Sequence, residues 1–208
     1  MTMQETLIVD FTKGRLGYRC HPKRAHHEPL AKAIGLKPNY YPTIIDTTAG
    51  LGQDAFILAS LGCAVFCLER EHKVATVLKN AISHAQLNET LAPIAKRIHC
   101  IEGDSIDYLA NLKPLEYPDV IYCDPMFEPR SKSAKVKKGM QWLQATVPFT
   151  RDAKTLGMLA LEIAKDRVII KRHRKAPNLL GTPTFSIEGR QCRFDIYQIP
   201  PHKEECEK

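Results

Sequence analysis

The chain has 208 residues, of which 44% are hydrophobic and 25% charged, as in an ordinary soluble globular protein. That length suits one domain with a substantial core. The sequence has neither a run of about 18 apolar residues nor a secretory signal at its start, so we expect a cytoplasmic protein without a membrane partner. The seven cysteines include no C-x-x-C pair, and their odd number argues against a disulfide framework. The net charge of +7 is only weak evidence for a polyanionic partner.

The first 42 residues differ from the rest and are expected to form a short N-terminal arm. Within it, residues 7–11 and 16–19 could pair as two strands, and residues 30–36 have a helical pattern. In residues 43–208, strand-like and helix-like patterns alternate. This alternation predicts an α/β domain with a mainly parallel sheet.

The expected elements of this second part follow one another along the chain. Strands are expected at residues 43–46, 64–68, 97–101, 119–123, 168–171, 184–187 and 193–199, and longer helices at residues 53–61, 73–86 and 152–164. The last two strands enclose Glu188-Gly189, which is a hairpin-turn signal. The sheet is therefore not expected to be purely parallel.

The most informative local pattern is DTTAGLGQDA, residues 46–55, between the first strand and the first long helix. Gly50 and Gly52 permit backbone conformations and close approaches that side chains would block. The N–H groups at the start of the following helix can bind a polar or anionic ligand. The loop therefore predicts a nucleotide-like cofactor at the carboxyl end of the sheet. The alternative is a glycine turn in an α/β domain without a ligand.

The sequence of the loop is compatible with two different cofactors. The pattern Gly50-x-Gly52-x-x-Ala55, with Glu69 about 20 residues further on, also satisfies the dinucleotide fingerprint, which makes NAD a serious alternative. Asp46 argues against NAD, because a carboxylate at the strand end attracts the ammonium and sulfonium charges of S-adenosylmethionine and does not help a pyrophosphate. The loop is also longer than the tight turn that places a pyrophosphate on a helix. We therefore expect S-adenosylmethionine, with S-adenosylhomocysteine as the product.

Polar residues also follow the next two strands. Glu69-Arg70 ends the second strand, where the carboxylate can accept both ribose hydroxyls of a cofactor; the alternative is a solvated charge cluster. Asp104-Ser105 follows the third strand and could reach the adenine edge. The alternative for this pair is a helix N-cap, for which both residue types are preferred.

The fourth strand ends in DPMF, residues 124–127, which points to the chemistry. Asp124 would accept from an exocyclic amine, and Pro125 fixes the local backbone. Phe127 offers an aromatic face on which a base can stack. These three residues are the candidate catalytic group. Asp-Pro also begins ordinary turns, so the motif gains its specificity from its position after the fourth strand of a glycine-loop domain.

Six segments in this order resemble the RsmJ (YhiQ) family: DTTAGLGQDAFILASLG, LER, DPMF, VKKGM, IIKR and RFDIY. The family consists of class I methyltransferases that methylate N2 of a guanine in 16S ribosomal RNA. The resemblance therefore implies a Rossmann-like seven-stranded sheet with the last strand antiparallel, S-adenosylmethionine as cofactor and the small ribosomal subunit as partner. By position, it implies cofactor contacts from Gln53, Asp54, Glu69, Arg70, Asp104, Ser105 and Asp124.

Basic residues flank the candidate catalytic motif. Their charge predicts contacts with RNA phosphates, since phosphates dominate the affinity of nucleic-acid-binding proteins. The candidates are Lys132, Lys135, Lys137 and Lys138 after the motif, and Lys171, Arg172 and Arg174 after the fifth strand. A solvated lysine-rich surface is the alternative. The spacing of Cys20, His21, His26 and His27 matches no standard zinc pattern, so no metal is expected.

Three functions remain open at this point. The leading one is methylation of guanine N2 by direct displacement, with Asp124 stabilising the charge that develops on the amine. The second is a methyltransferase that acts on another base or on a small molecule. The third is a non-catalytic module that binds RNA or a dinucleotide.

Overall fold

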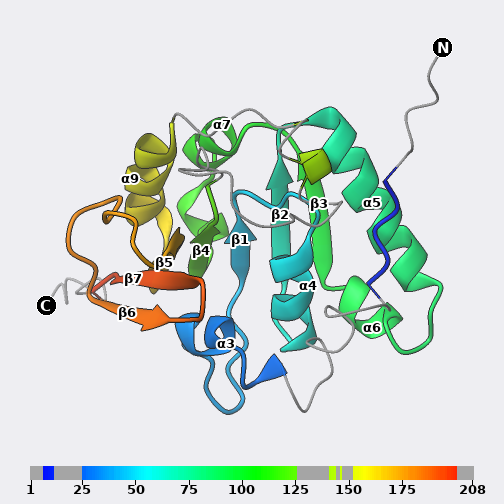
Figure 1. Ribbon diagram of the computed structural model, residues 1–208, viewed down its shortest axis with the longest axis horizontal. Coiled ribbons are helices and arrows are strands. Elements are labelled where there is room, and N and C mark those ends of the chain that lie inside the picture. The colour runs from blue at the N-terminus through cyan, green and yellow to red at the C-terminus, as the bar shows by residue number, and fades with distance from the viewer. Residues whose placement is uncertain (1–6, 12–24, 126–140, 144–145, 147–151, 201–208) are drawn as a thin grey trace, which may run out of the picture.

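The computed structural model describes residues 7–11, 25–125, 141–143, 146 and 152–200, and its centre is a seven-stranded sheet (Figure 1). The strands are β1 (Ile44–Asp46), β2 (Val65–Glu69), β3 (Ile98–Glu102), β4 (Val120–Cys123), β5 (Arg167–His173), β6 (Phe185–Glu188) and β7 (Cys192–Gln198). Their order is β3-β2-β1-β4-β5-β7-β6, and β7 is antiparallel to both of its neighbours while the first five strands are parallel. The expected seven-stranded sheet with an antiparallel last strand is confirmed.

Helices cover both faces of the sheet. They are α3 (Pro29–Ala33), α4 (Gln53–Ser60), α5 (His72–Gln86), α6 (Ala92–Ala95), α7 (Ser105–Ala110) and α9 (Ala153–Ile163), with a 3-10 turn at Pro114–Glu116. In α5, Val74, Leu78 and Ile82 are buried at intervals of four residues, which is the spacing of one helix face. No helix in the described ranges is both long and apolar enough to cross a membrane.

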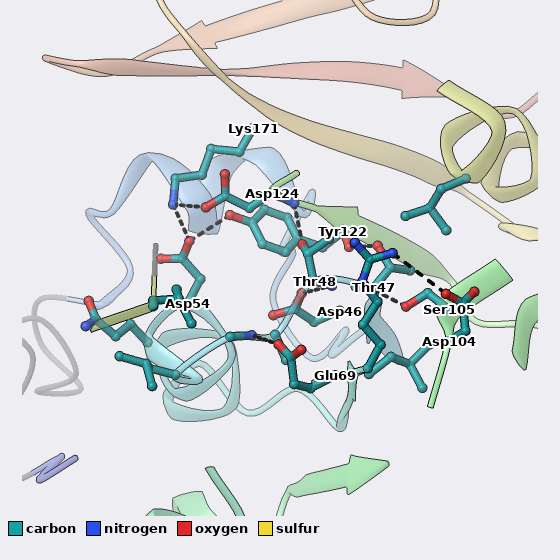
Figure 2. A pocket seen from close by; sticks show the side chains of 18 of the residues that line it. Asp46, Thr47, Thr48, Asp54, Glu69, Asp104, Ser105, Tyr122, Asp124 and Lys171 are labelled. Carbon is teal, nitrogen blue, oxygen red and sulfur yellow. Dashed lines mark hydrogen bonds and ion pairs between the residues drawn. The ribbon is translucent and has the colours of Figure 1, made fainter. Parts of the chain in front are cut away.

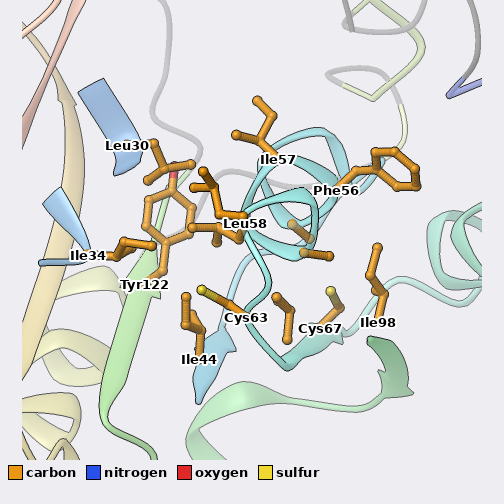
Figure 3. Close-up of a cluster of buried hydrophobic side chains, with 14 of the residues drawn as sticks. Leu30, Ile34, Ile44, Phe56, Ile57, Leu58, Cys63, Cys67, Ile98 and Tyr122 are labelled. Atoms are coloured by element: carbon orange, nitrogen blue, oxygen red, sulfur yellow. The ribbon is translucent and has the colours of Figure 1, made fainter. Parts of the chain in front are cut away.

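Two hydrophobic clusters form the core, one on each face of the sheet. Neighbouring residues of a strand contribute to different clusters, as the two-residue period of a strand requires: Ile44 and Ile169 belong to one, and Ile45 and Ile170 to the other. The first cluster lies under α4 and includes Tyr122 of β4, whose ring is 1% exposed (Figure 3). The central strands β1, β4 and β5 are therefore buried on both sides, whereas β6 at one edge of the sheet is mostly exposed.

The described parts of the first 42 residues pack into the same core. Phe11 stacks on Phe56 of α4 with ring centroids 4.3 Å apart, and Leu30 and Ile34 are fully buried beside α4 (Figure 3). The guanidinium of Arg167 donates to the carbonyl of Ala33 at 3.1 Å, which ties the end of α3 to β5. Residues 7–11 do not form the expected strand, and residues 16–19 lie outside the described ranges.

Truncation of Phe11 is expected to show how much this segment contributes to the fold. Because the ring is 2% exposed and stacked, Phe11→Ala should lower the free energy of unfolding by about 3–5 kcal/mol. Ile8→Ala is the control, since Ile8 is 85% exposed and its truncation should change stability by about 0.5 kcal/mol or less. Urea unfolding of the three proteins measures both effects. Equal small changes would mean that the segment is an arm independent of the domain.

Candidate cofactor and substrate site

A cavity of about 390 Å³ opens at the carboxyl ends of β1, β2, β4 and β5 (Figure 2). This volume lies within the range of about 300–1,000 Å³ that is usual for small-molecule sites. Strand order brings the ends together, because β1 lies between β2 and β4, at the point where the chain changes its direction of progress across the sheet. The cavity is therefore at the position where open α/β sheets bind ligands.

The glycine loop forms one wall of the cavity. Gly50 and Gly52 have φ angles of +52° and +72°, which residues with side chains rarely adopt. A Cβ atom at Gly52 would also collide with the side chain of Leu78. The N–H of Gly50 donates to the carboxylate of Glu69 at 3.0 Å, so the loop is held against the end of β2 (Figure 2).

Asp46 lies at the end of β1 and is 1% exposed. Its carboxylate accepts the N–H of Thr48 at 3.1 Å. The pKa of Asp46 is raised from its usual 3.8 to about 8, chiefly by burial and also by the nearby carboxylates of Asp54 and Asp124, whereas the Thr48 N–H and Lys171 oppose the shift. The free protein therefore exchanges a proton at Asp46 near neutral pH, and a cationic ligand would favour the ionised form.

Lys171 joins two carboxylates on the β5 side of the cavity. Its Nζ donates to Asp54 at 2.6 Å and to Asp124 at 2.7 Å, which links α4 to the end of β4 (Figure 2). The hydroxyl of Tyr122 also donates to Asp54, at 2.7 Å. The N–H of Asp124 donates to Thr48 Oγ1 at 2.6 Å, so the backbone of Asp124 is fixed to the glycine loop.

The β2 and β3 side of the cavity carries a second polar group. Asp104 caps α7, because its Oδ1 accepts the N–H of Ile106 at 2.8 Å, so the N-cap interpretation is correct. Its other oxygen faces Arg70 at 3.9 Å, and Arg70 also lies 3.6 Å from Asp152 at the start of α9. Ser105 Oγ donates to the carbonyl of Thr47 at 2.7 Å.

The structure brings the predicted cofactor residues together. Of these ten residues, all but Gly52 line the cavity, and Gly52 caps α4 directly behind it: Asp46, Gly50, Gln53, Asp54, Glu69, Arg70, Asp104, Ser105 and Asp124. Pro125 is buried next to Asp124. Phe127 and the candidates Lys132, Lys135, Lys137 and Lys138 lie outside the described residues. The roles of all these residues remain predictions.

The basic residues Lys171, Arg172 and Arg174, expected after the fifth strand, do not all lie on one exposed surface. The strand continues to His173, so neighbouring side chains point to opposite faces of the sheet. Lys171 points into the cavity, and Arg172 is only 7% exposed. Arg174 is exposed and pairs with Glu188 at 2.6 Å. These three residues therefore face different surroundings, and their contacts with RNA phosphates remain predictions.

The charged side chains that line the cavity fit S-adenosylmethionine better than NAD. Six acidic and two basic side chains of the described residues line it: Asp46, Asp54, Glu69, Asp104, Asp124 and Asp152, and Arg70 and Lys171. A cavity with this excess of carboxylates attracts an ammonium or sulfonium group and repels a pyrophosphate. The Gly50 N–H, which a pyrophosphate would need, already donates to a carboxylate.

Comparisons with known proteins agree with this chemistry. Residues 1–199 match the SAM_MT family model, described as "Putative SAM-dependent methyltransferase". A protein of Nitrosococcus oceani named ribosomal RNA small subunit methyltransferase J is 42% identical over 192 residues, which are 92% of this chain and 76% of the relative. A protein of the same name from Thioalkalivibrio sulfidiphilus is 44% identical over 91% of this chain and 74% of its own length.

Solved structures give the same fold. The crystal structure of a SAM-dependent methyltransferase from Neisseria gonorrhoeae has a TM-score of 0.74 and 32% sequence identity, and the match covers 98% of this chain and 78% of the other. A protein of Haemophilus influenzae described as a "putative methylase" shares the fold at a TM-score of 0.54 with 16% identity, and the match covers 85% of this chain and 97% of the other.

Proposed function

Because the chain belongs to the family of SAM-dependent methyltransferases, we propose that it transfers a methyl group to N2 of a guanine in small-subunit ribosomal RNA. The observation that carries this proposal is the position of Asp124, which directly follows β4 and lines the same cavity as Asp46. The names of the relatives support ribosomal RNA of the small subunit as the substrate. The cytoplasm, where ribosomes are assembled, is the proposed location.

The residues at the carboxyl ends of β1 and β2 are proposed to hold the cofactor. S-adenosylmethionine supplies the methyl group as an activated sulfonium. Asp46 provides a buried negative charge for the cationic end of this cofactor, and Glu69 lies at the strand end where a ribose can be bound through its hydroxyls. Arg70 and Asp104 form the far wall of the cavity. No metal is required for this reaction.

Asp124 is proposed to hold and deprotonate the acceptor amine. Its side chain is 40% exposed and lines the cavity, so it can accept an N–H of a base that has left its stack. Burial raises the pKa of the Asp124 carboxyl, while Lys171 opposes this shift. The raised pKa makes the carboxylate a better acceptor for the proton that the methylated amine must release. Phe127 is proposed to stack on the base.

Methyl transfer to purified RNA tests the proposed function. The protein is incubated with methyl-labelled S-adenosylmethionine and small-subunit RNA, either naked or in assembled subunits, from cells that lack the corresponding enzyme. Digestion to nucleosides should give labelled N2-methylguanosine from the small subunit and none from large-subunit RNA. Label in another nucleoside would mean that the acceptor is not guanine N2. Label found only in small molecules would mean that the substrate is not RNA.

The lysines after the DPMF motif give a separate prediction about RNA binding. If Lys132, Lys135, Lys137 and Lys138 contact phosphates, each contact should contribute roughly 0.7–0.9 to the slope of log affinity against log salt. Changing all four to Gln should therefore flatten this slope by up to about 3 and reduce affinity most at low salt. A salt titration of RNA binding with S-adenosylhomocysteine present measures the change. Superimposed titrations would mean that the four lysines are a solvated surface.

A further inference from the structure

Lys171 has one hydrogen-bond donor more than its two carboxylate contacts require. An ammonium has three N–H donors, and the described residues provide Asp54 and Asp124 as acceptors for two of them. The side chain is 24% exposed and lines the cavity (Figure 2). One donor can therefore point at a bound ligand.

The ammonium of Lys171 is a permanent donor at neutral pH. Although burial alone would lower its pKa, the carboxylates of Asp124 and Asp54 raise the pKa of Lys171 well above its ordinary value. Lys171 therefore cannot act as the base of the reaction. Lys171 is not the sole residue that holds Asp54, because the Tyr122 hydroxyl donates to the same carboxylate oxygen of Asp54 at 2.7 Å.

The Lys171–Asp124 pair matches one base edge. It places a donor beside an acceptor, with Nζ and Oδ2 2.7 Å apart. The Watson–Crick edge of guanine has the acceptor O6 beside the donors N1–H and N2–H. Adenine has a donor at the corresponding C6 position and an acceptor at N1, so the same pair would face two mismatched contacts. Enzymes that flip a base out of its stack recognise it by such contacts with this edge.

Building on the proposed function, we propose that Lys171 determines guanine specificity: its ammonium donates to O6 of the target guanine while Asp124 accepts from the N1–H and N2–H edge. The strand arrangement supports this role, because Cys123 and Ile170 are paired residues of β4 and β5, and Asp124 and Lys171 come directly after them. Neighbouring strands thus bring the two groups together, and the Asp124 backbone is held in addition by its N–H, which donates to Thr48 Oγ1 at 2.6 Å.

The test compares two RNAs that differ only at the target base. Once the methylated guanine has been mapped, RNA fragments carry either guanine or 2-aminopurine there. The second base keeps the N2 amine but lacks both O6 and N1–H, so its methylation is compared only with and without Lys171. Lys171→Met should lower the single-turnover methylation rate on guanine RNA by about 10- to 150-fold, the effect of one charged hydrogen bond. On 2-aminopurine RNA, the same substitution should change the rate by about 2-fold or less.

A charge-balanced variant separates recognition from electrostatics. Asp54→Asn combined with Lys171→Met removes one negative and one positive charge, so the net charge of the cavity is unchanged. Asp54 is itself a predicted cofactor contact, so the rates on both RNAs can fall, but the ratio of guanine to 2-aminopurine methylation in this double variant should stay as low as in Lys171→Met. Recovery of guanine methylation in it would mean that Lys171 only neutralises the carboxylates, and equal losses on both RNAs would mean that it only positions Asp124. Either result overturns the proposal.

Two further measurements distinguish a role of Lys171 in base recognition from a role in cofactor binding and from failure of the proposed function. The affinity of Lys171→Met for S-adenosylhomocysteine should stay within about 2-fold of wild type, and a larger loss that accounts for the rate would assign Lys171 to the cofactor instead. If the wild-type protein methylates no guanine at all, the proposed function itself fails. If it methylates guanine but the variants lose both RNAs equally, only the role of Lys171 fails.

Discussion

Asp46→Asn is expected to weaken the binding of S-adenosylmethionine by about 10- to 100-fold and to stabilise the cofactor-free protein at alkaline pH. Asn keeps an oxygen that can accept the Thr48 N–H, so the loop should keep its conformation. What the substitution removes is a buried negative charge, which the cationic cofactor needs and the free protein holds at a cost.

The raised pKa of Asp46 determines how the free energy of unfolding of the cofactor-free protein depends on pH. The pKa of Asp46 is about 8 in the folded protein and 3.8 is its usual value, so the folded state holds the proton more tightly. The stabilising contribution of the protonated residue is complete below about pH 4 and is lost as the pH rises to about 8. Above that pH, Asp46→Asn should raise the free energy of unfolding by up to about 6 kcal/mol, because each unit of the pKa difference corresponds to about 1.4 kcal/mol.

Binding should depend on pH in the opposite sense. The cationic cofactor favours ionised Asp46, so wild-type affinity should fall about tenfold for each pH unit below 8, with a proton released on binding. Asp46→Asn should remove most of this dependence. Calorimetry in two buffers of different ionisation enthalpy measures both quantities, with NAD as a negative control. Tight, pH-independent binding to the variant would contradict the proposed charge attraction.

Asp124→Asn is expected to lower the methylation rate by about 10²- to 10⁴-fold, the usual contribution of a general base. The amide cannot accept the proton from the amine, and it offers Lys171 a weaker partner than the carboxylate does. Binding of S-adenosylhomocysteine should fall much less, because Asp46 and Glu69 remain.

A matched control makes this result specific. Asp107→Asn makes the same chemical change at an exposed residue of α7 that does not line the cavity, and it should leave the rate unchanged. Single-turnover methylation of small-subunit RNA measures all three proteins. Near-normal activity of Asp124→Asn would move the acceptor site away from β4.

The position of the cavity was predictable because each strand end has its own local signal. Asp46, Glu69 and Asp124 each end or follow an apolar run, and Gly50 and Gly52 mark a loop. In a parallel sheet, the carboxyl ends of the strands share one edge, so these separate signals converge. The fold itself followed from the alternation of strand and helix patterns, which depends on local sequence.

The role of Lys171 was not predictable from the basic run KRHRK. Lys171 lies 117 and 47 positions from its two partners in the sequence, and the contacts exist only because β5 lies beside β4 and α4 begins at the same end of these strands. The run looked like an exposed segment because the apolar part of the strand ends at Ile170. The strand in fact continues to His173, and its period of two separates Lys171 from Arg172.

Short elements were missed for a different reason. The six residues of α7 and the four of α6 are too few for a helical period to be recognised, although the Asp104 cap was a correct local signal. The burial of Phe11 was missed because its partner Phe56 is 45 positions away, and a short apolar segment does not reveal its partner.

Mass mapping of small-subunit ribosomal RNA tests the central claim most directly. RNA from cells with an intact gene should contain an N2-methylated guanine that is absent when the gene is deleted. The wild-type gene should restore the modification, and the Asp124→Asn gene should not. An identical methylation pattern with and without the gene would contradict the assignment of this protein as a methyltransferase of small-subunit ribosomal RNA.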